Sequence, residues 1–531
     1  MRKRIWISLI RFALSVLLCT VALLSSGFAD EPKYGGTLRI GARIPQYDRL
    51  DVRYPLTPSM VPTFEWIYDR LFNWGKESFD NLVPGLATKY ETKDAKVWTI
   101  HLRKGVKFHN GREMTAEDVK VNFDWRIRTP KGWQPVIYKE YIRYLNRVEV
   151  LDKYTIRIVL DQPFSSLMPI LAYAVRGISP PEEVEKWQDK FSFHPCGTGP
   201  FKVVEIKPPD RIVLERFDGY WGPRPYVDRI EMKYIRSEEA RLVALQNGEI
   251  DIAQLYDEAK PIIEKDTNLK YEEVVHSATL NKLYFNMRRW PMNDIRFRKA
   301  MWMGADWKNI SINAFPFKSG NFPRTLLDRT KYFNSEALKL VPPYNPEEAK
   351  KLIQQVEKDS GKKIPPIYYL QSSSGPNTAA AEMAKIQLAQ VGINLDLHLM
   401  SHAIWSDKLA RDPKMEWDVG GIGYGFSQDP HLGFDAFVTN SGTAPDGKSL
   451  GAYSNPEFDK WIVKAEQATS EEDRKKCFQE AEKILLRDVT CIPAFYLRLL
   501  IAWNKKLKGV VTHPDGSIYV SNQWVNIGLE K

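Results

Sequence analysis

The chain has 531 residues, of which 43% are hydrophobic and 27% are charged, and its formal net charge is +10 at pH 7. This length exceeds what one hydrophobic core accommodates, since single cores stop growing at about 250–300 residues, so we expect two large lobes. Lysine and arginine are scattered along the sequence rather than gathered in one basic patch. That distribution argues against a nucleic-acid partner.

The first 29 residues have the pattern of a cleaved secretory signal peptide. Basic residues open the segment, an apolar run follows over Phe12–Leu24, and small residues suit the cleavage site at Gly27 and Ala29. The apolar run is shorter than the ~20 residues that a membrane span needs. An uncleaved signal anchor is the alternative, but Arg11 interrupts any longer apolar run. We therefore expect a mature chain from residue 30 in the periplasm.

Three cysteines lie beyond this segment, Cys196, Cys477 and Cys491, so at least one thiol is free. Cys477 falls within a helical pattern and Cys491 on the strand that follows. A helix packed on a strand keeps their Cα atoms roughly 10 Å apart, beyond the ~7 Å that a disulfide can bridge. This geometry disfavours a bridge between them, although the pairing stays open.

Helices and strands alternate along the mature chain. Thr115 is expected to begin a helix, with Asp118 reaching back to it as in a capping box. We predict strands over 36–43, 97–102, 148–160, 201–206, 249–253, 283–287, 364–371 and 393–400. We predict helices over 63–71, 115–126, 237–247, 295–305, 347–353 and 377–391. This alternation predicts α/β lobes built on mixed sheets.

Several patterns typical of enzymes and metal sites are weak or missing. The glycine-rich segment Cys196–Phe201 is followed by a strand, so we interpret it as a turn and not as a phosphate loop. His398 and His402 are predicted on a strand and in a loop, which does not give the helical spacing of metal ligands. We expect no GxSxG nucleophile elbow, no HExxH motif and no Cys–His nucleophile, and therefore no enzyme.

Six blocks of sequence, taken in order, resemble those of a known family. They are 34–40, 108–123, 197–201 with 214–222, 283–307, 345–353 with 387–397, and 453–462 with 492–497. In these blocks the chain is similar to extracellular solute-binding proteins of family 5, the oligopeptide, dipeptide and nickel type. The resemblance implies an α/β two-lobe periplasmic-binding-protein clamp of type II, with mixed sheets and an extra subdomain in lobe I.

The resemblance also implies boundaries for these parts. Lobe I would comprise residues 30–54, 205–277 and 495–531, its extra subdomain 55–204, and lobe II 278–494. The two segments that cross between the lobes would lie near 276–282 and 491–497. Closure of such a clamp is a rotation at a few hinge residues, and selectivity comes from contacts made when both lobes engage the ligand.

The strongest candidate for the ligand site is the glycine-rich segment 420–430, interpreted as a loop. It fits a dinucleotide fingerprint poorly, because no helix is expected behind the glycines and Pro430 interrupts the pattern. As a cleft wall, its glycines would allow close backbone approach. Tyr424 and Phe426 would offer flat apolar faces, and Gln428 and Asp429 polar anchors. A purely structural loop is the alternative.

Two positions depart from the peptide-binding members of the family. In that branch an aspartate four residues before the proline holds the ligand's α-amino group, and an arginine in the loop aligned with 371–376 holds its carboxylate. Here those positions are Phe426 and Ser374. Losing both anchors removes charge-assisted hydrogen bonds worth about 1.5–3 kcal/mol each, which argues against a short zwitterionic peptide unless Asp429 binds the amine.

The remaining candidate ligand residues are Tyr47, Trp133, Trp405 and Arg176. The three aromatic residues fall where the family's cleft would lie, and apolar faces of this kind suit sugar rings, hydrophobic peptides or cyclic compounds. Arg176 resembles the cleft cation of nickel binders, which hold a chelated metal.

The resulting hypothesis is a monomeric, periplasmic substrate-binding component of an ABC-type importer. Such a protein captures a peptide-like or other small solute and delivers it to a permease in the cytoplasmic membrane, without a cofactor or a metal ion of its own. Three alternatives stay open at this point: an oligosaccharide or chelated-metal binder of the same family, a receptor that delivers its ligand to a sensor, and a secreted hydrolase.

Overall fold

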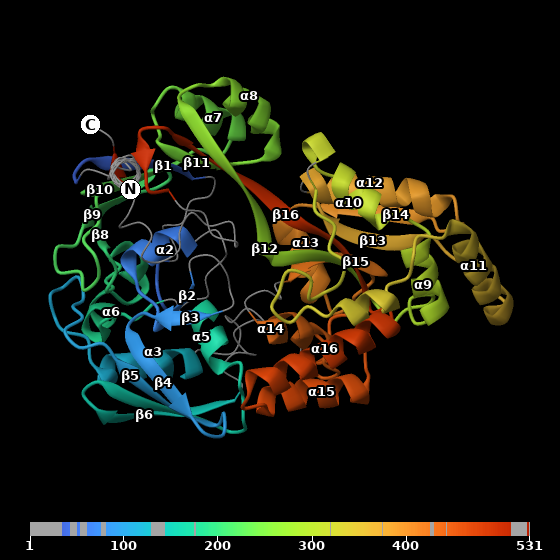
Figure 1. The fold of residues 1–531 in the computed structure, drawn as a ribbon, viewed down its shortest axis with the longest axis horizontal. Helices are drawn as coiled ribbons and strands as arrows, with labels where there is room; N and C mark the ends of the chain where they lie inside the picture. The colour runs from blue at the N-terminus through green and yellow to red at the C-terminus, as the bar shows by residue number, and fades with distance from the viewer. Residues whose placement is uncertain are drawn as a thin grey trace, which may run out of the picture.

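The computed structural model describes residues 34–42, 50–53, 61–75, 81–128, 144–174, 177–318, 320–373, 375–424, 429–441, 443–510 and 528–529. Within these ranges a ten-stranded sheet, a four-stranded sheet and two two-stranded sheets are combined with helices (Figure 1). The predicted α/β class with mixed sheets is confirmed. No helix in the described ranges is long and apolar enough to cross a membrane.

The ten-stranded sheet has the order β14-β13-β15-β12-β16-β11-β1-β10-β9-β8. Its strands are β1 (Thr37–Ala42), β8 (Phe201–Lys207), β9 (Arg211–Arg216), β10 (Arg229–Tyr234), β11 (Ile252–Leu255), β12 (Leu269–Phe285), β13 (Ile367–Ser372), β14 (Leu395–Met400), β15 (Val419–Tyr424) and β16 (Cys491–Asn504). β1 runs parallel to β10 and β11, and β13 parallel to β14 and β15; the other pairs are antiparallel.

Two long strands in the middle of this sheet join its two halves. β12 and β16 pair from Leu269 opposite Asn504 to Tyr284 opposite Cys491, with a register shift between His276 and Leu280. The ends of both strands pack in different hydrophobic clusters. The sequence predicted only 283–287 as a strand here, whereas β12 has 17 residues. The charged residues Lys270, Glu272 and Glu273 in its first half, which contacts helix α8 (Lys260–Lys265), conceal the strand from the sequence pattern.

Helices cover both faces of the second half of the sheet, β14-β13-β15-β12. One cluster contains side chains of α9 (Ile295–Met303), α10 (Trp307–Asn313), α11 (Pro346–Ser360) and α12 (Gly375–Ala389). The other contains side chains of α13 (His402–Ala410), α14 (Pro430–Phe434), α15 (Pro456–Gln467) and α16 (Glu471–Arg487). The predicted helix at 347–353 is thus the first part of the longer α11.

A separate core surrounds the four-stranded sheet, whose order is β4-β5-β7-β6. Its strands are β4 (Ala87–Thr92), β5 (Val97–Leu102), β6 (Leu145–Asp152) and β7 (Thr155–Leu160), and its helices α3 (Ala116–Arg128), α5 (Leu167–Ala174) and α6 (Pro181–Trp187). The remaining elements are α2 (Val61–Ile67), β2 (Phe72–Trp74), β3 (Leu82–Pro84), α7 (Glu238–Gln246), α8 (Lys260–Lys265), β17 (Leu507–Lys508) and β18 (Gly528–Leu529).

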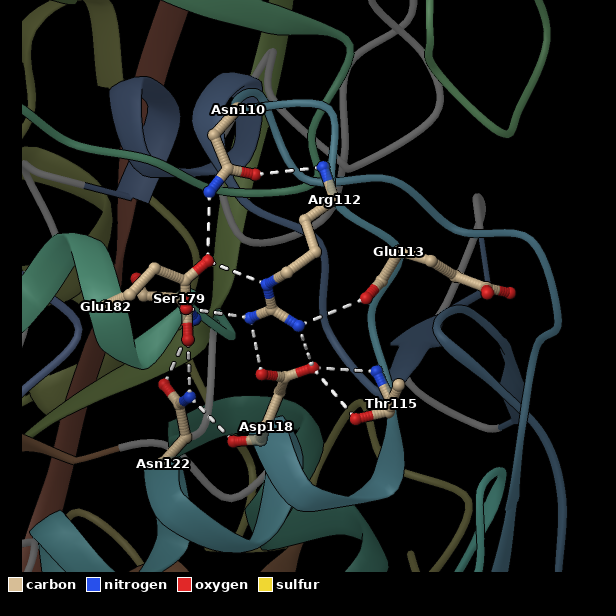
Figure 2. Close-up of polar contacts among 8 residues, drawn as sticks. All are labelled: Asn110, Arg112, Glu113, Thr115, Asp118, Asn122, Ser179 and Glu182. Atoms are coloured by element: carbon tan, nitrogen blue, oxygen red, sulfur yellow. Dashed lines mark hydrogen bonds and ion pairs between the residues drawn. The ribbon is translucent and has the colours of Figure 1, made fainter.

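The start of α3 is tied to the first turn of α6 and to the loop before it by a partly exposed polar network (Figure 2). The Asp118 carboxylate accepts a hydrogen bond from the Thr115 amide at 2.7 Å, which confirms the expected reach back to the helix start. The Arg112 guanidinium donates to Asp118 at 2.6 Å and to Glu182 at 2.6 Å. The side-chain amide of Asn122 donates to the carbonyl of Ser179 at 2.7 Å. The block 108–123 therefore holds the start of α3 against the start of α6.

The segment 197–201 is a tight turn, as predicted, and it packs against the end of α2. A Cβ at Gly199 would lie 2.5 Å from the carbonyl oxygen of Trp66, so only glycine fits. The buried Asp69 carboxylate accepts hydrogen bonds from Thr198 at 2.9 Å and from the indole of Trp221 at 2.8 Å. Burial raises the pKa of Asp69 to about 7 despite these donors. The segment that follows α2 is thereby joined to the turn at 197–201 and to the block 214–222, which are far away in sequence.

The cysteines Cys196, Cys477 and Cys491 are free and buried. Burial raises the pKa of the Cys491 thiol to about 12, which keeps it protonated and unreactive at neutral pH.

Candidate functional site

The side chains of most predicted ligand residues lie outside the described part of the structure. These residues are Tyr47, Trp133, Arg176, Ser374, Phe426 and Gln428, together with the side chain of Tyr424. Their role in binding stays a prediction. The elements that lead into several of them are described, however, and so are the side chains of Trp405 and Asp429.

Three adjacent parallel strands end at one edge of the sheet, and candidate residues follow each of them. β14, β13 and β15 are neighbours, and β13 pairs in parallel with both others. Ser374 follows the end of β13, Trp405 follows β14, and the segment 425–429 follows β15 in the sequence. In open α/β sheets, ligands bind in the crevice outside the carboxyl ends of the strands. The described carboxyl ends of β13, β14 and β15 therefore lie together at an edge where ligands bind in such sheets.

The same edge adjoins the part of the paired strands β12 and β16 that passes from one half of the molecule to the other. Leu280 of β12 pairs with Tyr424 of β15 and with Tyr496 of β16, directly after the register shift that follows His276. A ligand held at this edge would touch the part of the sheet at which the two halves of the molecule join.

The glycine-rich segment is a strand in its first half, and the interpretation of 420–430 as one loop is wrong there. β15 pairs with β12 on one side and with β13 on the other. A Cβ at Gly421 would lie 1.8 Å from the amide nitrogen of Gln371, and one at Gly420 would lie 2.4 Å from Leu409. These glycines make room for neighbouring side chains within the protein, so their role is packing.

Pro430 begins a helix rather than interrupting the pattern. Asp429 is the N-cap of α14, and its carboxylate accepts a hydrogen bond from the His431 amide at 3.0 Å. Proline suits the first helical position because its missing N–H would have no partner in the helix. The expectation that no helix follows the glycines is corrected accordingly, although α14 has only five residues.

The Asp429 carboxylate is 1% exposed and is held by protein partners. It forms an ion pair with Arg474 of α16 and accepts a hydrogen bond from the Ser166 hydroxyl at 3.1 Å. Burial opposes the charge of Arg474, but the nearby Asp429 carboxylate outweighs it and raises the pKa of the guanidinium. Asp429 therefore remains a proposed ligand anchor whose described contacts are all within the protein.

Trp405 is 7% exposed and packs in the core cluster that includes Leu409 and Trp417. The described structure thus places it beneath the strand ends, inside the helical layer formed by α13.

The subdomain around the four-stranded sheet touches the α14–α16 layer directly. The Ser165 amide donates to the carbonyl of Glu466 at 2.7 Å, and the Ser165 hydroxyl donates to the carbonyl of Ala465 at 2.7 Å. The ring of Phe164 lies edge-on to that of His431, with centroids 4.9 Å apart. Both carbonyl groups belong to the last turn of α15, and Figure 1 shows α14, α15 and α16 on the side of lobe II that faces the subdomain.

A buried lysine lies in β12, next to the strand ends. Lys282 is 1% exposed, and its ammonium group donates to the carbonyl of Leu280 at 3.3 Å. Burial lowers the pKa of Lys282 from 10.5 to about 7.

Sequence patterns that resemble those of enzymes or metal sites have the following places in the described ranges. The expectation of no GxSxG pattern is wrong as a statement about the sequence, because Gly447–Gly451 reads GKSLG. Ser449 is nevertheless 0% exposed in a loop, and its hydroxyl donates to the carbonyl of Tyr453 at 2.9 Å. His402 begins α13 rather than lying in a loop. The described residues contain no group of three or more metal-ligating side chains.

Comparison with known proteins identifies the class of this fold. The structure of the ABC transporter substrate-binding protein CtaP from Listeria monocytogenes superposes with a TM-score of 0.81 at 21% identity, covering 94% of this chain and 100% of that one. NikZ from Campylobacter jejuni, solved with Ni(L-His), superposes with a TM-score of 0.77 at 22% identity, covering 93% and 99%. The fold is that of a solute-binding protein.

The chain belongs to the bacterial extracellular solute-binding proteins of family 5. The model of the middle region of that family matches residues 81–445. The glutathione-binding protein GsiB of Escherichia coli O157:H7 is 26% identical over 515 residues, covering 94% of this chain and 95% of the relative. The chain is accordingly a substrate-binding component of ABC-type import, and the relatives compared here are binding proteins.

The contact residues Ser165, Ser166 and Arg474 were not singled out from the sequence. Arg474 carried a signal nonetheless, because it stands on the same helical stripe as the buried Cys477, Phe478 and Ala481. A charged residue on such a stripe needs a buried partner. The two serines offered no comparable signal, since serine before a helix is common.

Proposed function

We propose that this protein closes two lobes on a small, peptide-like solute and presents it to a permease in the cytoplasmic membrane. The observation that carries the proposal is the single sheet shared by both halves of the molecule. The carboxyl end of β15 lies beside the part of β12 that crosses between the halves, and β13 and β14 follow it in the sheet, so a ligand at this edge is placed to govern the angle between the halves.

The lobes of this proposal follow the predicted boundaries. Lobe I comprises 30–54, 205–277 and 495–531, with the subdomain 55–204, and lobe II comprises 278–494. In support, β12 and β16 change from one set of hydrophobic clusters to another along their length. The register shift between His276 and Leu280 falls within the proposed crossing and provides a break in the ladder where rotation can occur.

The ligand class follows from what the relatives bind and from the residues at the strand ends. GsiB is named for glutathione, a short peptide-like solute. The positions that grip charged peptide ends in the peptide-binding branch are Phe426 and Ser374 in this chain. We therefore propose a peptide-like solute gripped through apolar and neutral polar contacts by Tyr424, Phe426 and Gln428. Asp429 fixes the end of that segment.

The protein acts in this proposal without catalysis, as a monomer in the periplasm, after removal of residues 1–29. The ligand-free and ligand-bound chains differ in lobe angle only, and the ligand leaves unchanged.

A ligand screen tests the proposal. Residues 30–531 would be assayed by thermal shift against dipeptides, glutathione, oligosaccharides and Ni(L-His), with isothermal titration calorimetry on each hit and mass spectrometry of the recovered ligand. With cyclic and end-capped dipeptides included in the screen, we expect stabilisation by such a peptide-like compound without charged ends, more than by glutathione, and recovery of the compound intact. Stabilisation by an oligosaccharide or Ni(L-His) alone would contradict the proposed ligand class. Recovery of a hydrolysed product would show that the protein is an enzyme and contradict the proposed binding function.

Variants of the strand-end segment complete the test. Tyr424→Ala and Phe426→Ala should each weaken binding of the identified compound about tenfold or more, as loss of an aromatic contact does. Tyr344→Ala is a suitable control, since this tyrosine is 52% exposed in the loop before α11. Equal affinity in all three variants would remove the segment from the site.

A further inference from the structure

We propose that Ser165, Ser166 and Arg474 form a latch that holds the two lobes together in the ligand-free protein. The inference rests on the two-lobe clamp proposed above and adds a direct bond between the lobes that does not pass through the ligand. Ser165 and Ser166 stand immediately before α5 in the subdomain of lobe I, and Arg474 lies in α16 of lobe II.

The lobe II side of the latch is a buried guanidinium with bonds in several directions. Arg474 is 5% exposed, pairs with Asp429, and donates to the Tyr332 hydroxyl at 2.9 Å. Both of these partners belong to lobe II. The charge of Arg474 is therefore compensated within its own lobe, whatever the position of the other lobe.

The lobe I side consists of neutral hydroxyl groups. Arg474 donates to the Ser166 hydroxyl at 2.7 Å and to the Ser165 hydroxyl at 3.1 Å. Ser166 in turn donates to Asp429 at 3.1 Å, so a single pair of serines bonds to both members of the ion pair. The Ser165 hydroxyl also bonds to the carbonyl of Ala465.

The latch is reversible because both charged groups belong to lobe II and only neutral hydroxyl groups belong to lobe I. Separating two buried opposite charges is strongly unfavourable, but opening the lobes leaves Arg474 and Asp429 together and exposes to water the serine hydrogen bonds and the ring contact between Phe164 and His431. The serine bonds to Arg474 and Asp429 are stronger than bonds between neutral groups, but water replaces them when the lobes open, so their net contribution to stability is limited. The latch therefore biases the lobe angle without locking it.

The latch also reaches the ligand segment. Asp429 directly follows Gln428, and it holds the start of α14 through the His431 amide. Ser165, Ser166 and Arg474 are thus positioning residues: they act on the site through Asp429. Closure made before the ligand arrives raises the fraction of molecules that are competent to bind tightly.

The test measures the lobe angle directly, in residues 30–531 without any ligand. Spin labels on cysteines introduced at Lys104 in lobe I and Lys363 in lobe II, both exposed, would report the distance between the lobes by pulsed electron resonance. The native cysteines are buried and should remain unlabelled. We expect Ser165→Ala/Ser166→Ala to raise the ratio of open to closed molecules by about tenfold or more, since several hydrogen bonds between the lobes are lost.

Ser449→Ala is the matched control, because it removes a buried serine hydroxyl whose acceptor, the carbonyl of Tyr453, lies in the same lobe. It should leave the distance distribution of the wild type unchanged. The proposal is overturned if the double variant and the wild type give the same distribution, or if the ligand-free wild type is already fully open. Because no ligand is added, this result stands whether or not the ligand screen succeeds.

Discussion

Replacing Lys282 by methionine should stabilise the protein, and the gain should depend on pH. The ammonium group of Lys282 is 1% exposed, and burial lowers its pKa from 10.5 to about 7. The unfolded chain therefore binds more protons than the folded chain between these two values, so folding is progressively disfavoured as pH falls from about 10.5 to 7. Below pH 7 the full penalty is present.

The size of the penalty follows from the shift. One pKa unit corresponds to about 1.4 kcal/mol, so the lysine costs on the order of 4 kcal/mol at pH 7 relative to a neutral side chain of similar shape. Methionine fills nearly the same space without a charge. For a lobe of this size, 1 kcal/mol corresponds to roughly 2–4 °C in Tm, so Lys282→Met should raise Tm on the order of 10 °C at pH 7.

The assay is differential scanning calorimetry of wild type and Lys282→Met from pH 6 to pH 10. The difference in Tm should be largest at pH 6–7 and shrink steadily toward pH 10. Lys339→Met, at a lysine whose side chain is 72% exposed, should show no such trend. A difference that is the same at pH 6 and pH 10, or a variant that is less stable at pH 6, would refute the reasoning.

Three further predictions concern the anchoring contacts of the fold. The pKa of Asp69 is raised to about 7, so its contribution to the free energy of unfolding is largest below pH 4 and is lost as pH rises through 7. In urea unfolding, Asp69→Asn should reduce the pH dependence of the free energy of unfolding between pH 4 and 7. Gly199→Ala should destabilise the chain by about 1–3 kcal/mol in the same assay, because its Cβ meets the carbonyl of Trp66, while Gly375→Ala, whose Cβ would meet no atom within 4 Å, is its control. Arg112→Lys should lower the stability of the subdomain by about 1–3 kcal/mol, since lysine cannot bond to Asp118 and Glu182 together.

The alternation of helices and strands could be predicted because most elements carry their own start and stop signals. Ser237 caps α7, and Gly392, with a φ of 91°, follows α12 as a terminating residue should. The capping contact of Asp118 was predictable for the same reason, since it is local in sequence. Local hydrogen bonds and turn preferences decide these features, and the sequence displays both.

Features that depend on distant neighbours could not be predicted. β12 is a 17-residue strand because β16, far along the chain, pairs with it, and the charged residues of its first half conceal that pairing. Gly421 is required by the side chain of Gln371, which no local pattern reveals. The contacts of Arg474 with Ser165 and Ser166 join segments more than 300 residues apart, as the separation of 308 between Arg474 and Ser166 illustrates. The sequence could mark Arg474 as unusual but could not name its partners.

The pairing of β12 with β16 also constrains how the chain is made. β12 is synthesised and exported long before its partner, because residues 286–490 intervene between the two strands. Until β16 arrives, that side of β12 is an open edge, and open edges recruit strands from other chains. The charged residues Lys270, Glu272 and Glu273 stand in the half of β12 that would wait longest in this state, because it pairs with the last part of β16. The charges that hid this strand from the sequence pattern are thus well placed to keep the nascent chain from aggregating during export.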